Sequence, residues 1–274
     1  MYDSKLLQAG KRDGLATVFA RHYVSLVVMG RWPNGDVLKT SYSAFIFCSP
    51  EQWYLTTAGH NIADLKQAVD TGGLHSLSWQ LGDSFAGGVH PKTLPFDGRL
   101  DEWVVAYEQL EPGGADLAAF RLHGFHTRAL QVNGVVPLDL GADFIRLAER
   151  PCGMLLVLGV PKEKSAIGLG HLSQTLFAIP ALGIADTDVA PILRNGFRRH
   201  FGVIDSEVLA AASIDSVVGT SGGPVFGLWF SVDGKEFDYA AIGIQSSWDA
   251  RSRQIAAWPL DGVSRALATA FKDS

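Results

Sequence analysis

Three short segments, and their order along the chain, constrain this protein more than any other feature. They are Leu55-Thr56-Thr57-Ala58-Gly59-His60, Ala115-Asp116-Leu117-Ala118 and Gly219-Thr220-Ser221-Gly222-Gly223-Pro224. A serine hydroxyl is a weak nucleophile at neutral pH, so it needs an imidazole that accepts its proton and a carboxylate that orients the imidazole. The segments supply these groups in the order His60, Asp116, Ser221, and unrelated folds place such groups in different orders.

The order argues against two other folds that share a similar serine motif. Residues 219–223 also match the Gly-x-Ser-x-Gly turn of α/β-hydrolases, but those proteins place the acid and the histidine after the serine. Here the last of the eight histidines is His200, which precedes Ser221. Subtilisins use the order Asp, His, Ser, which Asp36 would allow. However, residues 222–230 are typical of a turn that enters a strand, so the subtilisin fold is disfavoured.

Taken together, the segments resemble those of the chymotrypsin-like (trypsin-fold) serine peptidases, which carry T-A-x-H, D-[IL]-A and G-x-S-G-G-P. They lie 56 and 105 residues apart, and the resemblance spans roughly residues 23–272. It implies an all-β fold of two six-stranded antiparallel β-barrels with the active site between them. It also implies a serine endopeptidase that needs no cofactor and acts on a protein or peptide substrate through an acyl-enzyme.

The resemblance assigns roles to particular residues in each of the three segments. Ser221 would be the nucleophile, His60 the base, and Asp116 the buried acid that holds His60. The backbone amides of Gly219 and Ser221 would form the oxyanion hole, which stabilises charge that develops in the transition state. We expect no metal, because the pair His123 and His126 lacks a third ligand at a telling spacing.

Thr220 departs from the pattern of the digestive and plasma relatives, which carry an aspartate before the nucleophile. In those proteins the aspartate pairs with a new N-terminal amine that zymogen cleavage releases. A threonine has no charge with which to hold an ammonium group. The chain therefore resembles bacterial members of the fold, and we expect no activation by insertion of a cleaved N-terminus.

The residues that would shape the substrate pocket are harder to assign. Asp215 lies six residues before Ser221, the offset at which trypsin-like relatives select Arg or Lys; an exposed loop acid is the alternative. The strand near residues 243–248 should pair with the substrate backbone, and either Ser246 or Ser247 could support Asp116. The candidate substrate-binding residues are Asp215, Ser246, Ser247, Trp248 and Ala256.

The composition is that of a packed globular protein without a polyanionic partner. Hydrophobic residues make up 47% and charged residues 19% of the chain. The net charge of −5 gives no reason to expect nucleic acid or an anionic membrane as a partner. The N-terminal region has no apolar signal-peptide core, and there is no run of about 18 apolar residues.

Cysteine usage favours a cytoplasmic location without structural disulfides. The chain has only two cysteines, Cys48 and Cys152. Secreted relatives usually carry a disulfide beside the catalytic histidine, but here Asn61 follows His60. A reducing compartment is the simplest explanation.

Short apolar runs separated by turn signals predict the domain organisation. Pro33-Asn34-Gly35-Asp36 between two such runs predicts a hairpin. We expect an N-terminal helical extension over residues 1–22, a first barrel over 23–130, a second barrel over 131–260 and a C-terminal helix over 261–274. The last of these follows from Asp261 as N-cap and apolar residues at helical spacing.

Two other functions stay open at this stage. A catalytically silent peptide-binding module, or pseudoprotease, could use the same cleft, and so could an esterase or transacylase. The basic cluster of residues 194–200 is interpreted as a solvated loop, or alternatively as a contact for a regulatory anion or protein partner.

Overall fold

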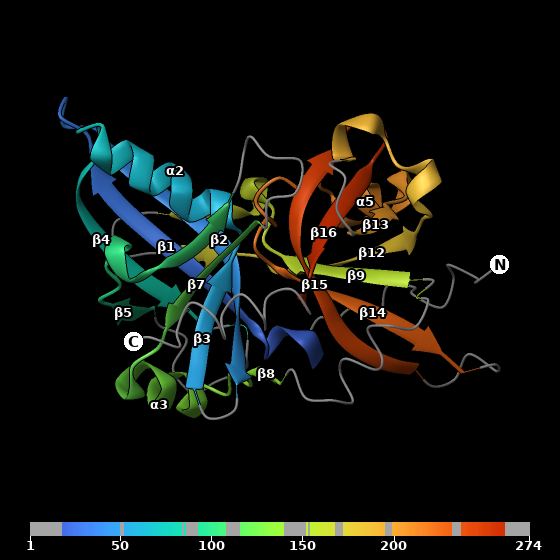
Figure 1. The fold of residues 1–274 in the computed structure, drawn as a ribbon, viewed down its shortest axis with the longest axis horizontal. Coiled ribbons are helices and arrows are strands. Elements are labelled where there is room, and N and C mark those ends of the chain that lie inside the picture. The colour runs from blue at the N-terminus through green and yellow to red at the C-terminus, as the bar shows by residue number, and fades with distance from the viewer. Residues whose placement is uncertain are drawn as a thin grey trace.

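Two β-rich bodies lie side by side in the computed structural model (Figure 1). The structure describes residues 18–49, 52–83, 85, 93–107, 116–139, 152, 154–167, 172–194, 199–231 and 237–260. One body is built from strands β1 to β8 and the other mainly from β9 to β16. No helix in these residues is long and apolar enough to cross a membrane. Both cysteines are free.

The first body is a large, mainly antiparallel sheet with the strand order β5-β4-β1-β2-β3-β7-β6. Its strands are β1 (Tyr23–Arg31), β2 (Val37–Ser49), β3 (Gln52–Thr57), β4 (His75–Gly82), β5 (Leu94–Phe96), β6 (Val104–Tyr107) and β7 (Asp116–Arg121), and β8 (Leu138–Asp139) pairs in parallel with β2. The predicted hairpin is confirmed, since β1 pairs with β2 up to Arg31 and Val37. Gly35 has φ 92° in this turn, a conformation that glycine adopts without steric cost.

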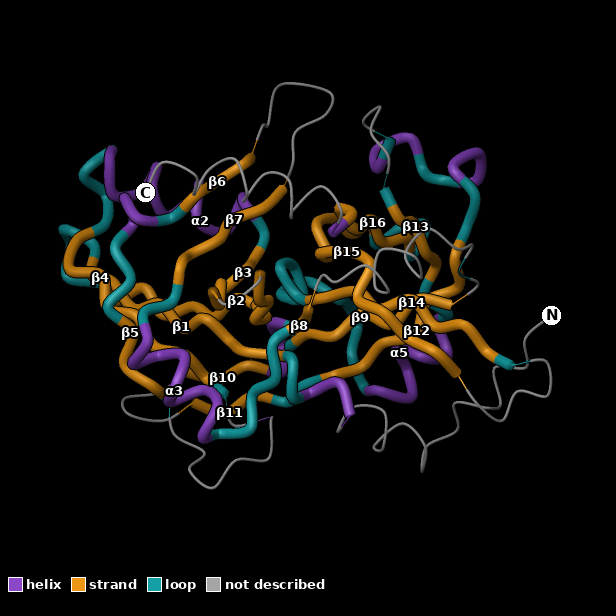
Figure 2. Tube along the Cα trace, turned by 60° about the horizontal axis from the view of Figure 1, so that its bottom comes forward, coloured by secondary structure: helices purple, strands orange, loops and turns teal. Residues whose placement is uncertain are grey.

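The second body contains a closed six-stranded barrel with the strand order β12-β13-β16-β15-β14-β9. Its strands are β9 (Met154–Gly159), β12 (Phe177–Gly183), β13 (His200–Val203), β14 (Pro224–Phe230), β15 (Phe237–Asp249) and β16 (Gln254–Pro259). A separate hairpin of β10 (Ser165–Ile167) and β11 (Leu172–Gln174) leaves this barrel and lies beside the first sheet (Figure 2).

Helices are short and lie outside the sheets. They are α2 (Gly59–Asp70), α3 (Gly124–Val132) and α5 (Ser206–Ala212), with 3-10 turns η3 (Leu100–Glu102), η4 (Lys162–Lys164), η5 (Asp186–Asp188) and η6 (Pro191–Leu193). The sequence predicts a short helical turn from His60 to Val69, and this prediction is confirmed by α2.

The predominantly β fold and one closed barrel agree with the sequence prediction, but a second closed barrel is not shown. The first sheet ends at β5 and β6, strands of three and four residues. No pairing between them closes the sheet within the described residues. Residues 18–20 are helical, whereas the rest of the expected N-terminal helix and the C-terminal helix over 261–274 lie outside the described residues. The domain division stays a prediction.

An apolar layer joins the two bodies and sets their relative position. One buried cluster contains Phe45 and Phe47 of β2 together with Leu156 of β9 and Phe226 of β14. Each fully buried side chain of this size contributes about 1.5–3 kcal/mol relative to exposure. Because this layer lies between the bodies, polar residues above it can meet from both.

Candidate active site

His60 and Asp116 form a tight pair in the first body. His60 lies in the first turn of α2, and Asp116 is the first residue of β7. His60 Nδ1 lies 2.9 Å from Asp116 Oδ2 and 3.1 Å from Oδ1. The backbone N–H of His60 also donates to Oδ1 at 2.9 Å. The side chain of Asp116 is 9% exposed and that of His60 is 26% exposed, so the acid is shielded and the imidazole reaches solvent.

Gly59 allows this approach, because α2 begins directly against the strands that carry Asp116. A Cβ atom at Gly59 would lie 2.8 Å from both the carbonyl oxygen of Ala106 and the amide nitrogen of Leu117. Any larger residue would push the helix away from β7. The glycine before His60 is therefore a packing requirement of the pair.

The carboxylate of Asp116 sets the protonation of His60. Burial by itself would lower the pKa of His60, but the hydrogen bond and charge of Asp116, with the charge of Asp64, raise it above its ordinary value. In the neutral ring, an Nδ1–H that donates to Asp116 leaves the lone pair on Nε2. Nε2 is the atom available to accept a proton.

The loop that carries Ser221 is held on both sides by backbone hydrogen bonds. Gly222 N–H donates to the carbonyl of Gln245 at 2.8 Å, and Gln245 N–H donates to the carbonyl of Gly223 at 3.0 Å. Gly222 has φ 93°, and a Cβ atom there would overlap the Thr57 hydroxyl and the Ser43 carbonyl. The loop therefore fits between β15 and the first sheet only with glycine at this position.

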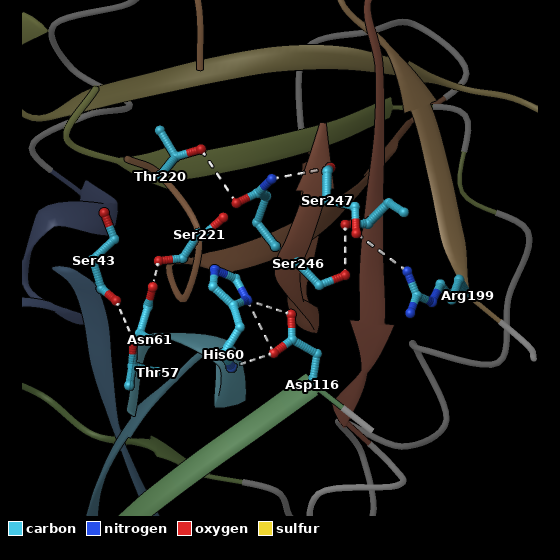
Figure 3. Close-up of polar contacts among 12 residues, drawn as sticks. Ser43, Thr57, His60, Asn61, Asp116, Arg199, Thr220, Ser221, Ser246 and Ser247 are labelled. Atoms are coloured by element: carbon cyan, nitrogen blue, oxygen red, sulfur yellow. Dashed lines mark hydrogen bonds and ion pairs between the residues drawn. The ribbon is translucent and has the colours of Figure 1, made fainter. Parts of the chain in front are cut away.

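Asn61 ties the Ser221 loop to the helix that carries His60. Its side-chain Nδ2 donates to the carbonyl of Ser221 at 3.2 Å and to Thr57 Oγ1 at 3.0 Å. Figure 3 shows the imidazole of His60 between the carboxylate of Asp116 and the Ser221 loop. In the sequence, Asn61 stands out only as the residue that follows His60 where secreted relatives carry a cysteine, and no motif predicts this bridge.

His60 and Ser221 open onto one cavity of about 400 Å³. The structure thus brings the three candidate residues together from two bodies. In the described part of the chain, no hydrogen bond joins the Ser221 hydroxyl to His60. Such bonds are often loose in the free protein and tighten when substrate binds.

Two backbone amides beside Ser221 are available as donors. Among the described residues, the N–H groups of Gly219 and Ser221 have no hydrogen-bond acceptor. The carbonyl of Val218 accepts from Lys162 N–H at 2.7 Å. Because the N–H and C=O of a trans peptide point in opposite directions, this bond turns the Gly219 N–H away from Lys162. Gly219 itself lines the cavity.

Ser43 fixes the other side of Gly219. Its hydroxyl accepts from Tyr23 Oη at 3.1 Å and from Val160 N–H at 3.2 Å. It donates to the carbonyl of Gly219 at 2.9 Å. Ser43 is 1% exposed and Tyr23 is fully buried. A satisfied buried network of this kind favours a single geometry. No sequence motif predicts it, because its members come from distant segments.

Thr220 completes the loop through neutral hydrogen bonds. It is fully buried, and its hydroxyl donates to the carbonyl of Val217 at 2.8 Å and lies 3.4 Å from Gln245 Oε1. Because the Thr220 side chain has partners within the second body, this loop needs no ion pair between residue 220 and the ammonium group of a cleaved N-terminus.

The candidate substrate-pocket residues lie apart from the cavity. Asp215 is exposed, and its N–H donates to Glu163 Oε1 at 2.9 Å. Ser246 donates to the carbonyl of Ala256 at 3.2 Å, and Ala256 is fully buried. Trp248 packs against the core of the second barrel. None of these four lines the 400 Å³ cavity, so their roles in specificity stay predictions.

Arg199 is a neighbour of the site that the sequence analysis placed in a solvated loop. It is half-buried, and its Nη1 donates to Ser247 Oγ at 3.4 Å (Figure 3). Burial lowers the pKa of Arg199, and the negative charge of Asp116 opposes this shift. The guanidinium therefore lies within electrostatic range of Asp116. The carboxylate of Asp116 has hydrogen bonds to His60, and neither Ser246 nor Ser247 donates to it in the described structure.

No metal site competes with this interpretation in the residues that the structure describes, where no cluster of three metal-ligating side chains occurs. His126 is 4% exposed, and its Nε2 lies 3.3 Å from the carbonyl of Pro95. No family model matches the chain, and no curated protein matches it.

Proposed function

We propose that this protein is a serine endopeptidase of the chymotrypsin-like type, with Ser221 as nucleophile, His60 as general base and Asp116 as its orienting acid. One observation carries the proposal. An imidazole held by a buried carboxylate through Nδ1 shares a cavity with Ser221, although the three residues come from two bodies. Structural histidines and turn serines have no need of this arrangement.

In the proposed reaction, His60 Nε2 accepts the proton of Ser221 as Oγ attacks the scissile carbonyl carbon. The amides of Gly219 and Ser221 stabilise the oxyanion, and one such donor contributes about 2.7–4 kcal/mol to the transition state. His60 then returns the proton to the leaving amine as the C–N bond breaks. Water then attacks the acyl carbon while His60 Nε2 takes its proton, and His60 returns this proton to Ser221 Oγ as the bond between Oγ and the acyl carbon breaks.

One observation favours the alternative, a catalytically silent module that binds peptides. Ser221 has no hydrogen bond to His60 in the described structure. A silent module would bind peptide in the cleft without forming an acyl-enzyme. An esterase or transacylase would form the acyl-enzyme but cleave no peptide.

Labelling with a fluorophosphonate probe separates these functions. The wild-type protein should be labelled at Ser221, and Ser221→Ala should lose labelling and peptide turnover, on the order of 10⁶-fold in kcat. His60→Ala should cost a similar amount, and the double variant little more, because the residues act as a unit. Absence of labelling in a folded wild-type protein that binds peptide would establish the silent module. If the protein is labelled by the probe and hydrolyses esters but not peptides, the esterase is established.

A further inference from the structure

The cavity beside Ser221 has two walls of different origin and a positive lining. On one side β2 contributes residues 39–42, and on the other the lining includes Lys162 of η4 with Ser165 and Ile167 of β10. Two lysines, Lys39 and Lys162, are among its lining residues, and no carboxylate is. This is notable in a chain with a net charge of −5.

The position of Lys39 follows from the pleat of β2. Alternate residues of a strand share one face, so Lys39 shares its face with Ser41 and Ser43. Ser41 Oγ lies 2.9 Å from Ser165 Oγ in the β10–β11 hairpin. Ser43 donates to Gly219 in the loop before Ser221. This face of β2 is therefore turned towards the second body, across the cavity.

The nearby carboxylates do not neutralise the two lysines. Glu163 is adjacent to Lys162, but its Oε1 accepts from the backbone N–H of Asp215. Asp64 on α2 is exposed and acts on the pKa values of His60 and Tyr42, although it does not line the cavity. Within the described part of the chain, neither Lys39 nor Lys162 forms an ion pair.

The walls of the cavity also indicate which part of a substrate it would hold. In the proposed reaction His60 returns its proton to the leaving amine, so the leaving group lies on the His60 side of Ser221. No residue of β15 lines this cavity, whereas His60, Gly219 and Ser221 do. The cavity therefore extends from Ser221 towards the part of the substrate that follows the scissile bond.

We propose that this cavity is a subsite for an acidic leaving group, so that the protein prefers substrates with Glu or Asp in the first residues after the scissile bond. This inference rests on the proposed function of Ser221. Two lysines in a lining that contains no carboxylate favour a substrate carboxylate. A partly exposed pair of this kind gives a modest selectivity, about tenfold for two lysines acting together.

Acyl transfer tests the subsite without knowledge of the acyl-side specificity. The full-length protein is acetylated at Ser221 by p-nitrophenyl acetate and then offered dipeptide amides as acceptors. The free amine of the acceptor attacks the acetyl carbon, and a C–N bond forms as the bond to Ser221 Oγ breaks. The amine proton passes to His60 and then to Oγ. Because this step reverses the departure of a leaving amine, the acceptor occupies the leaving-group site.

The acceptors are Glu-Gly-amide, Gln-Gly-amide and Gln-Gly with a free C-terminus, and mass spectrometry measures the acetylated products. We expect about tenfold more transfer to Glu-Gly-amide than to Gln-Gly-amide at low salt, and less difference at high salt. Gln-Gly with a free C-terminus tests whether a terminal carboxylate promotes acetyl transfer as well as a side-chain carboxylate does. Better transfer to it than to Glu-Gly-amide would overturn the preference for a side-chain carboxylate.

Variants assign the effect to the cavity. The double variant Lys39→Met, Lys162→Met should reduce the Glu to Gln ratio to about one, because both charges are removed. The backbone bond from residue 162 to Val218 does not depend on the side chain. Lys164→Met is the matched control, since Lys164 lies in the same 3-10 turn and is partly exposed but does not line the cavity. It should keep the ratio of the wild-type protein.

Each result bears on a different proposal. If no acetyl-enzyme forms at Ser221, the proposed function fails. If the acetyl-enzyme forms but transfers equally to the Glu and Gln acceptors, the function stands and the acidic subsite is wrong. A preference that survives in the double variant also overturns the assignment to Lys39 and Lys162.

Discussion

The hydroxyl of Ser43 donates a 2.9 Å hydrogen bond to the carbonyl oxygen of Gly219. A side chain of the first sheet thereby holds the peptide next to Ser221 in the second body. The peptide on the other side of Gly219 is held by Lys162 N–H through the carbonyl of Val218. The two bonds together orient the Gly219 amide, which the proposed mechanism uses as an oxyanion donor.

Ser43→Ala should therefore reduce kcat about tenfold with little change in KM, because the donor amide loses its support while substrate contacts remain. The measurement is steady-state kinetics together with the rate of probe labelling. Tyr23→Phe is the matched variant, since it removes a bond to the same hydroxyl but leaves the bond to Gly219. It should destabilise the fold by about 1 kcal/mol and affect kcat less. Equal kcat losses in the two variants would mean that Ser43 is only structural.

Asn61→Ala should slow labelling of Ser221, because it releases the Ser221 carbonyl from the helix that carries His60. We expect a loss of about 1 kcal/mol of stability as well, since a buried hydrogen bond is removed. The control is Asn133→Ala in the same body, where Asn133 Nδ2 donates to Asp83 at 2.6 Å. That variant should lose stability at an unchanged labelling rate. Equal labelling rates in both variants would contradict the bridging role.

The activity should fall as the pH drops through the pKa of His60, because only the neutral imidazole can act as base. Asp116 and Asp64 raise this pKa, so the loss should occur at a higher pH than for an unperturbed histidine. Asp64→Asn removes one of the raising charges and should move the acid limb of the kcat/KM profile to lower pH. A limb that moves to higher pH, or not at all at low ionic strength, would contradict this electrostatic assignment.

His22 should make the fold less stable in acid. Burial lowers its pKa from 6.5 to about 4, so between these values the unfolded chain binds a proton that the folded one resists. The contribution of neutral His22 to the free energy of unfolding is fully present above pH 6.5 and is lost as the pH falls towards about 4. The loss amounts to about 3 kcal/mol. Denaturant unfolding of wild type and His22→Gln should converge as the pH falls. Curves that stay parallel would show that His22 does not titrate in this way.

The labelled species should have the mass of the full-length chain, because the loop around Thr220 needs no cleaved N-terminus. Intact mass spectrometry after probe labelling measures this. Reducing agent should leave labelling unchanged, since both cysteines are free. Labelling of only a form that begins near Tyr23 would refute the inference from Thr220.

The sequence predicted local structure well where the residues that determine it are neighbours in the chain. Asn34-Gly35 between apolar runs predicted the β1–β2 hairpin. The sequence led to a wrong expectation for the solvent exposure of a basic segment, because tertiary packing decides which of its side chains are buried. Arg199 was read as solvated from its basic neighbours, yet the packing of β13 against β16 leaves it half-buried beside Ser247.

The segments around His60, Asp116 and Ser221 determined by themselves which residues are candidates for chemistry. Motif and chain order supply that information because they record which groups a reaction needs. Tertiary structure alone decided how these residues meet. The apolar layer between the bodies brings Ser43 to Gly219, Asn61 to Ser221, and Lys39 and Lys162 to one cavity. These contacts join residues more than a hundred positions apart, so no local pattern encodes them and only the packing of the two sheets creates them.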